Sequence, residues 1–124
     1  MIPPVCVIGN QEAIAVPKTR EEVLRLMQEF KARLQELYGE RLKGVYLYGS
    51  YARGEADEDS DIDVAVVLAG PVKRSEEDWR VDGMVSETCL REGCLIMPFF
   101  LSETEFTETP YAVFRSIVRE GVPV

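Results

Sequence analysis

The sequence predicts an α+β domain in which a small mixed β-sheet is packed by helices. Three observations support this fold class. The 124 residues are 46% apolar, which suits one compact core. Helical and strand patterns alternate in the order helix, strand, strand, helix, strand, helix, and Gly or Pro residues separate them. We therefore expect one domain over residues 19–124, with a sheet covered on one face in two layers, after an N-terminal arm or hairpin over residues 1–18.

The first elements are the arm and a capped helix. Residues 5–15 contain two short β-prone pieces around Gly9 and Asn10, which fit either a hairpin or an extended arm that ends at Pro17. Thr19 and Glu22 form a capping box, which predicts a helix that begins there and ends at Gly39. Its apolar residues recur at helical spacing: Val23, Met27, Phe30, Leu34 and Leu37.

Two strands follow this helix. Residues 45–48 are β-branched and aromatic and run into Gly49 and Ser50, which predicts a strand ending in a tight turn. Residues 62–68 are almost continuously apolar, as in a strand that is covered on both faces, and Gly70 and Pro71 follow it. The second strand is therefore expected at the centre of the sheet.

The rest of the chain predicts a helix, a strand and a last helix. Ser75 with Asp78 opens a helix that ends before Gly93, and residues 95–101 form the third strand. Ser102 and Glu105 cap a short turn, and Thr109 with Pro110 starts the last helix, which ends before Gly121. The apolar residues of the two helices are Trp79, Val81, Val85 and Leu90 in the first, and the expected buried stripe Tyr111, Phe114, Ile117 and Val118 in the second.

Composition excludes several functional classes. A formal charge of −8 disfavours direct DNA binding, because phosphate binding depends on basic clusters. The absence of histidine excludes Ser-His-Asp and Cys-His nucleophile systems. Three cysteines without paired CxxC spacing indicate neither a disulfide framework nor a zinc site, and no long apolar run or signal layout occurs. We therefore expect a cytoplasmic protein that does not enter a membrane.

The residues that carry chemistry are two acids and a glycine turn. Alternate residues of a strand share one face, so Asp61 and Asp63 converge on a common cation, for which Mg²⁺ with phosphate is the natural choice. Gly49 allows close backbone approach to a phosphate, Ser50 offers a hydroxyl and an amide, and Arg53 adds a planar guanidinium.

Simpler interpretations exist for each of these features. A Gly-Ser pair after a strand is usually only a turn, and an acidic run such as residues 55–63 is usually a solvated loop, which is our expectation for Asp57, Glu58 and Asp59. Tyr46 and Tyr48 are expected to be core or rim aromatics, and Cys89 and Cys94 to be buried small apolar residues. Asp61 and Asp63 differ, because unpaired acids are costly at the start of an apolar strand.

Together, residues 48–54 (YGSYARG) and 60–63 (SDID) resemble the Gly-Ser, ten-residue gap, Asp-x-Asp signature of the minimal nucleotidyltransferases of the DNA polymerase beta superfamily. The resemblance covers roughly residues 19–124, including the last helix (YAVFRSIVREG). It implies the polymerase beta-like fold and Mg²⁺-dependent transfer of a nucleoside monophosphate, AMP from ATP in our prediction. By position, Asp61 and Asp63 would be catalytic metal ligands, Gly49 and Ser50 would bind the triphosphate, and Arg53 would support it.

One departure from the family pattern concerns a third carboxylate. Active members commonly carry it on the next strand, where this chain has Met97; Glu92, Glu103 and Glu105 could replace it only with a shifted strand register.

Many such minimal proteins are antitoxins of helical HEPN toxins, which are RNases. The resemblance thus implies a protein adenylyltransferase that acts on a HEPN toxin. The alternative is a catalytically weak or inactive antitoxin that neutralises the toxin by binding. A small-molecule nucleotidyltransferase is a weaker third reading, and homo- and hetero-oligomers are both open.

Overall fold

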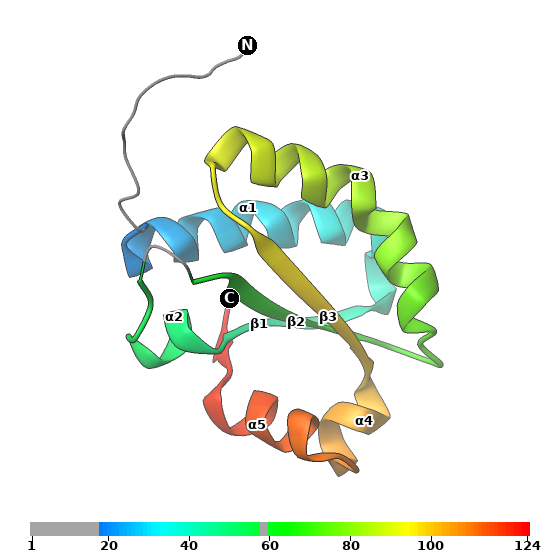
Figure 1. Ribbon diagram of the computed structural model, residues 1–124. Helices are drawn as coiled ribbons and strands as arrows, with labels where there is room; N and C mark the ends of the chain where they lie inside the picture. The colour runs from blue at the N-terminus through cyan, green and yellow to red at the C-terminus, as the bar shows by residue number, and fades with distance from the viewer. Residues whose placement is uncertain (1–17, 58–59) are drawn as a thin grey trace.

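The computed structural model describes residues 18–57 and 60–124, within which helices lie on both faces of a four-stranded sheet (Figure 1). The arm or hairpin expected before the domain lies outside the described residues, except for Lys18. The strands are β1 (Leu42–Tyr48), β2 (Ile62–Leu68), β3 (Ile96–Ser102) and β4 (Val122–Pro123). The helices are α1 (Arg20–Tyr38), α2 (Ser50–Arg53), α3 (Arg74–Glu92), α4 (Glu103–Glu108) and α5 (Ala112–Glu120), with a 3-10 turn η1 (Gly39–Arg41) after α1.

The sheet is mixed, as the sequence predicts, and its strand order is β3-β2-β1-β4. β1 runs antiparallel to β2 and to β4, whereas β2 runs parallel to β3 after the crossover through α3. The central position expected for β2 is confirmed. Each of the two outer strands contains a proline, Pro98 in β3 and Pro123 in β4.

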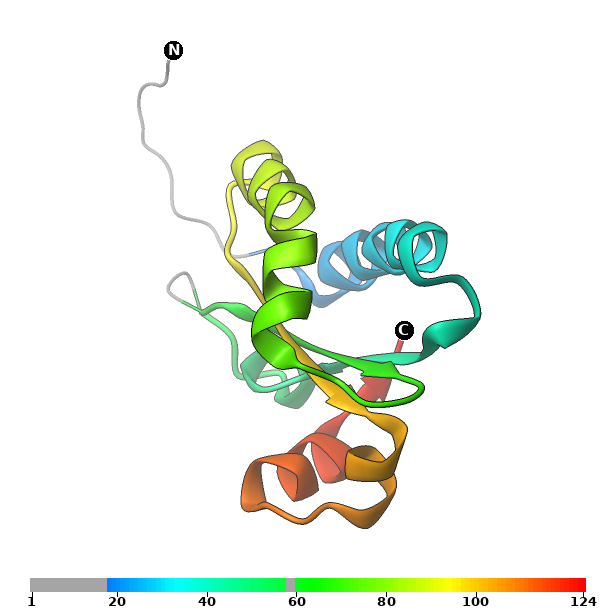
Figure 2. The ribbon, with the colours of Figure 1, turned by 90° about the vertical axis from the view of Figure 1, so that its right-hand side faces the viewer.

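One face of the sheet is covered by α1 and α3, which share the larger core cluster (Figures 1 and 2). The predicted capping box is confirmed, because the Thr19 hydroxyl accepts from the Glu22 N–H at 3.1 Å and the Glu22 carboxylate accepts from the Thr19 N–H at 2.8 Å. Of the five apolar residues that recur at helical spacing in α1, four are buried, but Leu37 is 46% exposed. At that end of the helix the next residue, Tyr38, is buried in its place, and Leu26 adds to the buried stripe further up the helix.

The other face of the sheet is partly covered by α4 and α5, so the two-layer arrangement with helices on one face was wrong (Figure 2). The reason lies in the second half of β2, whose alternate residues Ala65 and Val67 are buried on this face. Phe114 and Ile117 of α5 cover them, together with Leu101 of β3.

Two predictions for the last helix were also wrong. Tyr111 and Val118 are 65% and 43% exposed, so its buried stripe is narrower than expected. The N-cap is Tyr111, whereas Thr109 adopts a positive φ of 45° and ends α4. The chain turns between two helices here, and Thr109 closes the first of them before the second begins.

Helix α3 departs from its prediction at its start, and two of its large apolar residues are exposed. It begins at Arg74 after Lys73, one residue before the predicted cap at Ser75. Val81 faces the core, but Trp79 and Leu90 are 81% and 86% exposed. The inner side instead buries the carboxylate of Glu77, which accepts hydrogen bonds from the Tyr38 hydroxyl and from Arg80, both at 2.7 Å.

Candidate functional site: an acidic pair against a glycine turn

The glycine turn joins β1 to α2. Gly49 adopts φ 77° and ψ −154°, a conformation that is essentially restricted to glycine, and α2 begins at the next residue, Ser50. A Cβ atom at Gly49 would overlap with the Oδ2 atom of Asp63. The turn is therefore pressed against a carboxylate, and both backbone conformation and space require glycine here.

Asp63 lies at the start of β2 between two neighbouring strands. Its register partners are Tyr48 in β1 and Met97 in β3. Residues of β2 alternate between the two cores, so the Asp63 side chain lies on the face of Ala65 and Val67, where it is half-buried. The acid is thus displayed at the end of a buried strand.

The two acids of the pair influence each other. Burial raises the pKa of Asp63, the charge of Asp61 raises it further, and the charge of Arg53 lowers it. Asp61 is exposed and directly precedes β2, whereas Asp63 is half-buried. The structure therefore brings Gly49, Asp61, Asp63 and Arg53 together, as the sequence suggests.

The pKa of Tyr48, which lies opposite Asp63 on β1, is also affected by the charge of Asp63. Burial, and then the charge of Asp63, raise the pKa of Tyr48 to about 12. Its neighbour on the same strand face, Tyr46, stacks on Phe106 of α4 with ring centroids 4.8 Å apart. Both tyrosines are half-buried, which agrees with their prediction as core or rim aromatics.

Arg53 at the end of α2 is held by two acids. Its Nε donates to Glu55 at 2.7 Å, and its Nη1 donates to Glu120 at 3.0 Å. Glu120 is the last residue of α5, so this ion pair connects α2 with the C-terminal helix. Sequence reasoning missed Glu120, because 67 residues separate it from Arg53 and no local pattern joins them.

The chemistry of these residues fits a magnesium ion that a nucleotide helps to hold. Hard oxygen ligands from one or two carboxylates suit Mg²⁺, which usually completes its shell with water and substrate phosphates. No cluster of three or more potential ligands occurs in residues 18–57 and 60–124, and Asp61 and Asp63 are the two carboxylates that could hold such an ion beside the Gly49 turn. A cation between them would also remove the repulsion that raises the pKa of Asp63.

The strand position at which the family resemblance leads us to expect a third carboxylate holds a methionine. Met97 is in parallel register with Asp63 and is 46% exposed. Glu103 and Glu105 follow Ser102, whose register partner is Leu68 at the opposite end of β2. The sheet therefore keeps both glutamates away from the acidic pair.

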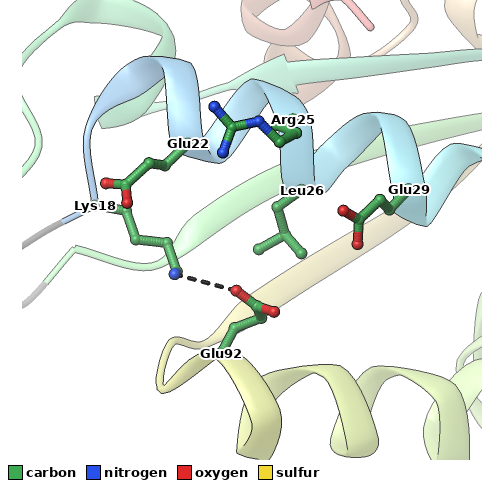
Figure 3. A pocket seen from close by; sticks show the side chains of 6 residues that line it. All are labelled: Lys18, Glu22, Arg25, Leu26, Glu29 and Glu92. Carbon is green, nitrogen blue, oxygen red and sulfur yellow. Dashed lines mark hydrogen bonds and ion pairs between the residues drawn. The ribbon is translucent and has the colours of Figure 1, made fainter.

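Glu92 has a different set of partners. It lines a pocket of about 240 Å³ between α1 and the end of α3. Figure 3 shows its carboxylate directed at Lys18, with which it pairs at 3.2 Å, and Arg91 donates to its other oxygen at 3.1 Å. Since the register is not shifted, none of the three glutamates replaces the missing acid.

The remaining sequence predictions near the site concern the acidic loop, the cysteines and a possible membrane span. Within the acidic loop, Asp57 is exposed and its N–H donates to the Ser60 hydroxyl at 2.8 Å, while Glu58 and Asp59 lie outside the described residues. Cys89 and Cys94 are free thiols and are half-buried, not fully buried as expected. Among the helices of the described residues, none combines the length and apolarity needed to cross a bilayer.

Comparison with known proteins identifies relatives across most of the chain. Residues 27–114 match the nucleotidyltransferase domain family. A predicted protein adenylyltransferase of Methanocaldococcus jannaschii is 32% identical over 83 residues, which cover 67% of this chain and 83% of the relative. Another from the same organism is 33% identical over 98 residues, covering 78% and 92%. The protein adenylyltransferase MntA of Thermococcus cleftensis is 48% identical over 48 residues, which cover 39% of this chain and 46% of that protein.

Solved structures share the fold at low sequence identity. A nucleotidyltransferase-type protein of Sulfolobus solfataricus superposes with a TM-score of 0.64 at 20% identity, covering 93% of this chain and 90% of that one. A chain from a toxin-antitoxin crystal structure with AMP-PNP gives a TM-score of 0.52 at 18% identity, covering 86% and 72%. With the family match over residues 27–114, the relatives above and this shared fold, the chain belongs to the nucleotidyltransferase domain family, as its Gly-Ser and Asp-x-Asp residues suggest.

Proposed function

We propose that this protein is a Mg²⁺-dependent adenylyltransferase that transfers AMP from ATP to a partner protein of the HEPN toxin class and thereby acts as an antitoxin. The observation that carries the proposal is the contact between the Gly49 turn and the Asp63 carboxylate, with Asp61 beside it. The relatives named protein adenylyltransferases support the reaction, and the toxin-antitoxin neighbour with AMP-PNP supports an adenine nucleotide and a toxin as the partner. The HEPN class of that toxin follows from the family resemblance of the Gly-Ser and Asp-x-Asp residues.

Two of the proposed site residues would bind the metal ion, and the others would bind the phosphates. Asp61 and Asp63 would hold Mg²⁺, which when bound neutralises phosphate charge and favours displacement at phosphorus. The turn at Gly49 and Ser50 would bring backbone N–H groups close to the triphosphate. Arg53 would exchange an acidic partner, Glu55 or Glu120, for a phosphate oxygen, since guanidinium groups pair with both.

The proposed transfer is a displacement at the α-phosphorus of ATP. A hydroxyl oxygen of the acceptor forms the new P–O bond, and the bond between the α-phosphorus and the bridging oxygen breaks. Pyrophosphate leaves, and the hydroxyl proton passes to solvent. The protein contributes mainly the alignment of the two reactants and the compensation of charge.

The test is label transfer from ATP to a purified protein of the HEPN class. We expect α-phosphate label on that protein in the presence of Mg²⁺, and no label with Asp61→Asn or Asp63→Asn. Glu103→Gln is the matched control, because Glu103 is an exposed acid at the opposite end of the sheet and should transfer as the wild type does. Equal labelling by the Asp63 variant would overturn the proposed site.

The second candidate is an antitoxin that binds its partner without transferring AMP. Met97 beside Asp63 favours it, because the third carboxylate that would help to hold metal is missing. In this case a stable complex forms, the partner's RNase activity is inhibited, and no label is transferred. Titration with ATP and Mg²⁺ in a calorimeter then decides whether the nucleotide still binds.

A further inference from the structure

The outer side of α3 carries two large apolar residues that nothing in the described chain covers. Trp79 is 81% exposed and Leu90 is 86% exposed. They are eleven residues apart, which is about three helical turns, so both lie on one stripe of the helix. In Figures 1 and 2, α3 lies at the outside of its layer, without a described helix or strand beyond it. Exposed apolar residues gathered on one helix face typically mark a binding surface.

The residues between these two on the stripe are small. Gly83 and Ser86 occupy the intervening turns, and both are exposed. A Cβ atom at Gly83 would meet no other atom within 4 Å, so packing inside the chain does not explain this glycine. Glycine weakens a helix interior relative to alanine. A helix face with large residues at both ends and small ones between them would allow another helix to approach closely.

The charge beside the stripe indicates the chemistry of the partner. Trp79 lines a pocket of about 340 Å³ together with Ser75, Asp78 and Asp82. Within the described chain, neither of these aspartates forms an ion pair or a hydrogen bond. A cationic side chain that enters this pocket would meet two carboxylates and the face of an indole ring, which together favour arginine or lysine.

From these observations we infer that the stripe Trp79, Gly83, Ser86 and Leu90 is the docking surface for a basic helix of a partner protein. Complementary charge argues against two other occupants. A second copy would bring the same aspartates together in a chain with net charge −8. Residues 1–17 of this chain contain no lysine or arginine, so they carry no cationic side chain that could pair with Asp78 and Asp82. The inference rests on the proposed function in taking a HEPN-class protein as the partner to be tested.

Trp79 reports on this surface directly, because it is the only tryptophan in the chain. The experiment follows its emission during titration with the HEPN-class protein of the label-transfer test, with that protein's own tryptophans replaced by phenylalanine. We expect a saturable shift to shorter wavelength as the indole leaves water. No shift under conditions where ultracentrifugation shows the complex would overturn the inference. A shift that appears on concentrating this chain alone would assign the surface to a second copy, and emission that is blue-shifted at every dilution would assign it to residues 1–17.

Two variants test the apolar and the charged parts separately. Leu90→Asp and the double variant Asp78→Lys with Asp82→Lys should each weaken the complex by about tenfold or more, as for central interface residues. Their matched controls are Leu37→Asp, at an exposed leucine of α1, and Glu103→Lys with Glu108→Lys, at two exposed acids of α4. Affinities equal to those of the controls would refute the surface.

Label transfer and docking fail in distinguishable ways. If AMP reaches the partner while Trp79 emission and the affinities of the α3 variants do not change, the proposed function stands and this docking surface is wrong. If Trp79 shifts and the α3 variants bind weakly but no AMP is transferred, the docking surface stands and the enzymatic proposal is wrong.

Discussion

Replacing Gly49 with alanine should destabilise the protein more than any other glycine-to-alanine change at a positive φ in its described residues. The backbone term comes from φ 77° and ψ −154°, which costs a residue with a Cβ atom about 1–3 kcal/mol. The packing term comes from the overlap with Asp63 Oδ2, and forcing such a contact costs about 1–3 kcal/mol more. We therefore expect a total loss of about 2–6 kcal/mol in the free energy of unfolding.

Gly54→Ala is the matched control for this change. Gly54 also has a positive φ, of 75°, but a Cβ atom there would meet nothing within 4 Å. Its cost should be only the backbone term, about 1–2 kcal/mol. Urea unfolding followed by circular dichroism measures the loss of unfolding free energy in both variants. In a thermal melt, the Tm of the Gly49 variant should lie roughly 10–20 °C below that of the wild type.

A double-mutant cycle separates the two terms. In an Asp63→Ala background the packing term should disappear, so Gly49→Ala should cost about 1–3 kcal/mol less than it does in the wild type. The backbone term should remain. If Gly49→Ala costs no more than Gly54→Ala, or if the cycle shows no coupling, the claim that the turn is pressed against the acid is wrong.

Three further changes test the packing, the charge and the metal site. Phe114→Ala should cost about 3–5 kcal/mol in urea unfolding, because the ring is 2% exposed beneath α5; a loss below about 1 kcal/mol would contradict that packing. Glu105→Gln should keep the helix cap but lose the pairing with Arg74, which lowers the pKa of Glu105. A lowered pKa stabilises the fold above 4.5 and ceases to do so as pH falls through the folded value, so the difference in Tm should narrow in acid; a gap independent of pH would contradict it. Met97→Asp should lower Tm in EDTA through repulsion with Asp63 and regain it with Mg²⁺, with faster label transfer; no response to Mg²⁺ would contradict the predicted metal site.

The parts of the fold that the sequence predicts well are those with local causes. The capping box of Thr19 and Glu22 fixes the start of α1 within four residues of chain. The apolar run of β2 predicts a central strand, since a strand covered on both faces has no polar side. The Gly49 turn and Asp63 lie in contact in the structure, because the antiparallel strands β1 and β2 place Tyr48 opposite Asp63.

The parts that sequence analysis missed depend on contacts between distant segments. Nothing near Arg53 indicates that Glu120 would reach it from α5. The exposure of Trp79 could not be predicted, because a helical pattern shows which residues are apolar but not which of them meet the sheet. The second helical layer was missed although the apolar run of β2 indicates cover on both faces, because that run does not show which helices provide the cover.

The prolines in the two outer strands limit how this protein can meet another chain. A proline has no backbone N–H, so a new strand laid along β3 or β4 would find a gap in the ladder of hydrogen bonds at Pro98 or Pro123. The sheet is therefore protected against growth by strand addition at either side. Recognition of another protein must therefore depend mainly on contacts between side chains and not on hydrogen bonds between strands. Self-association into extended sheets is disfavoured even at high concentration.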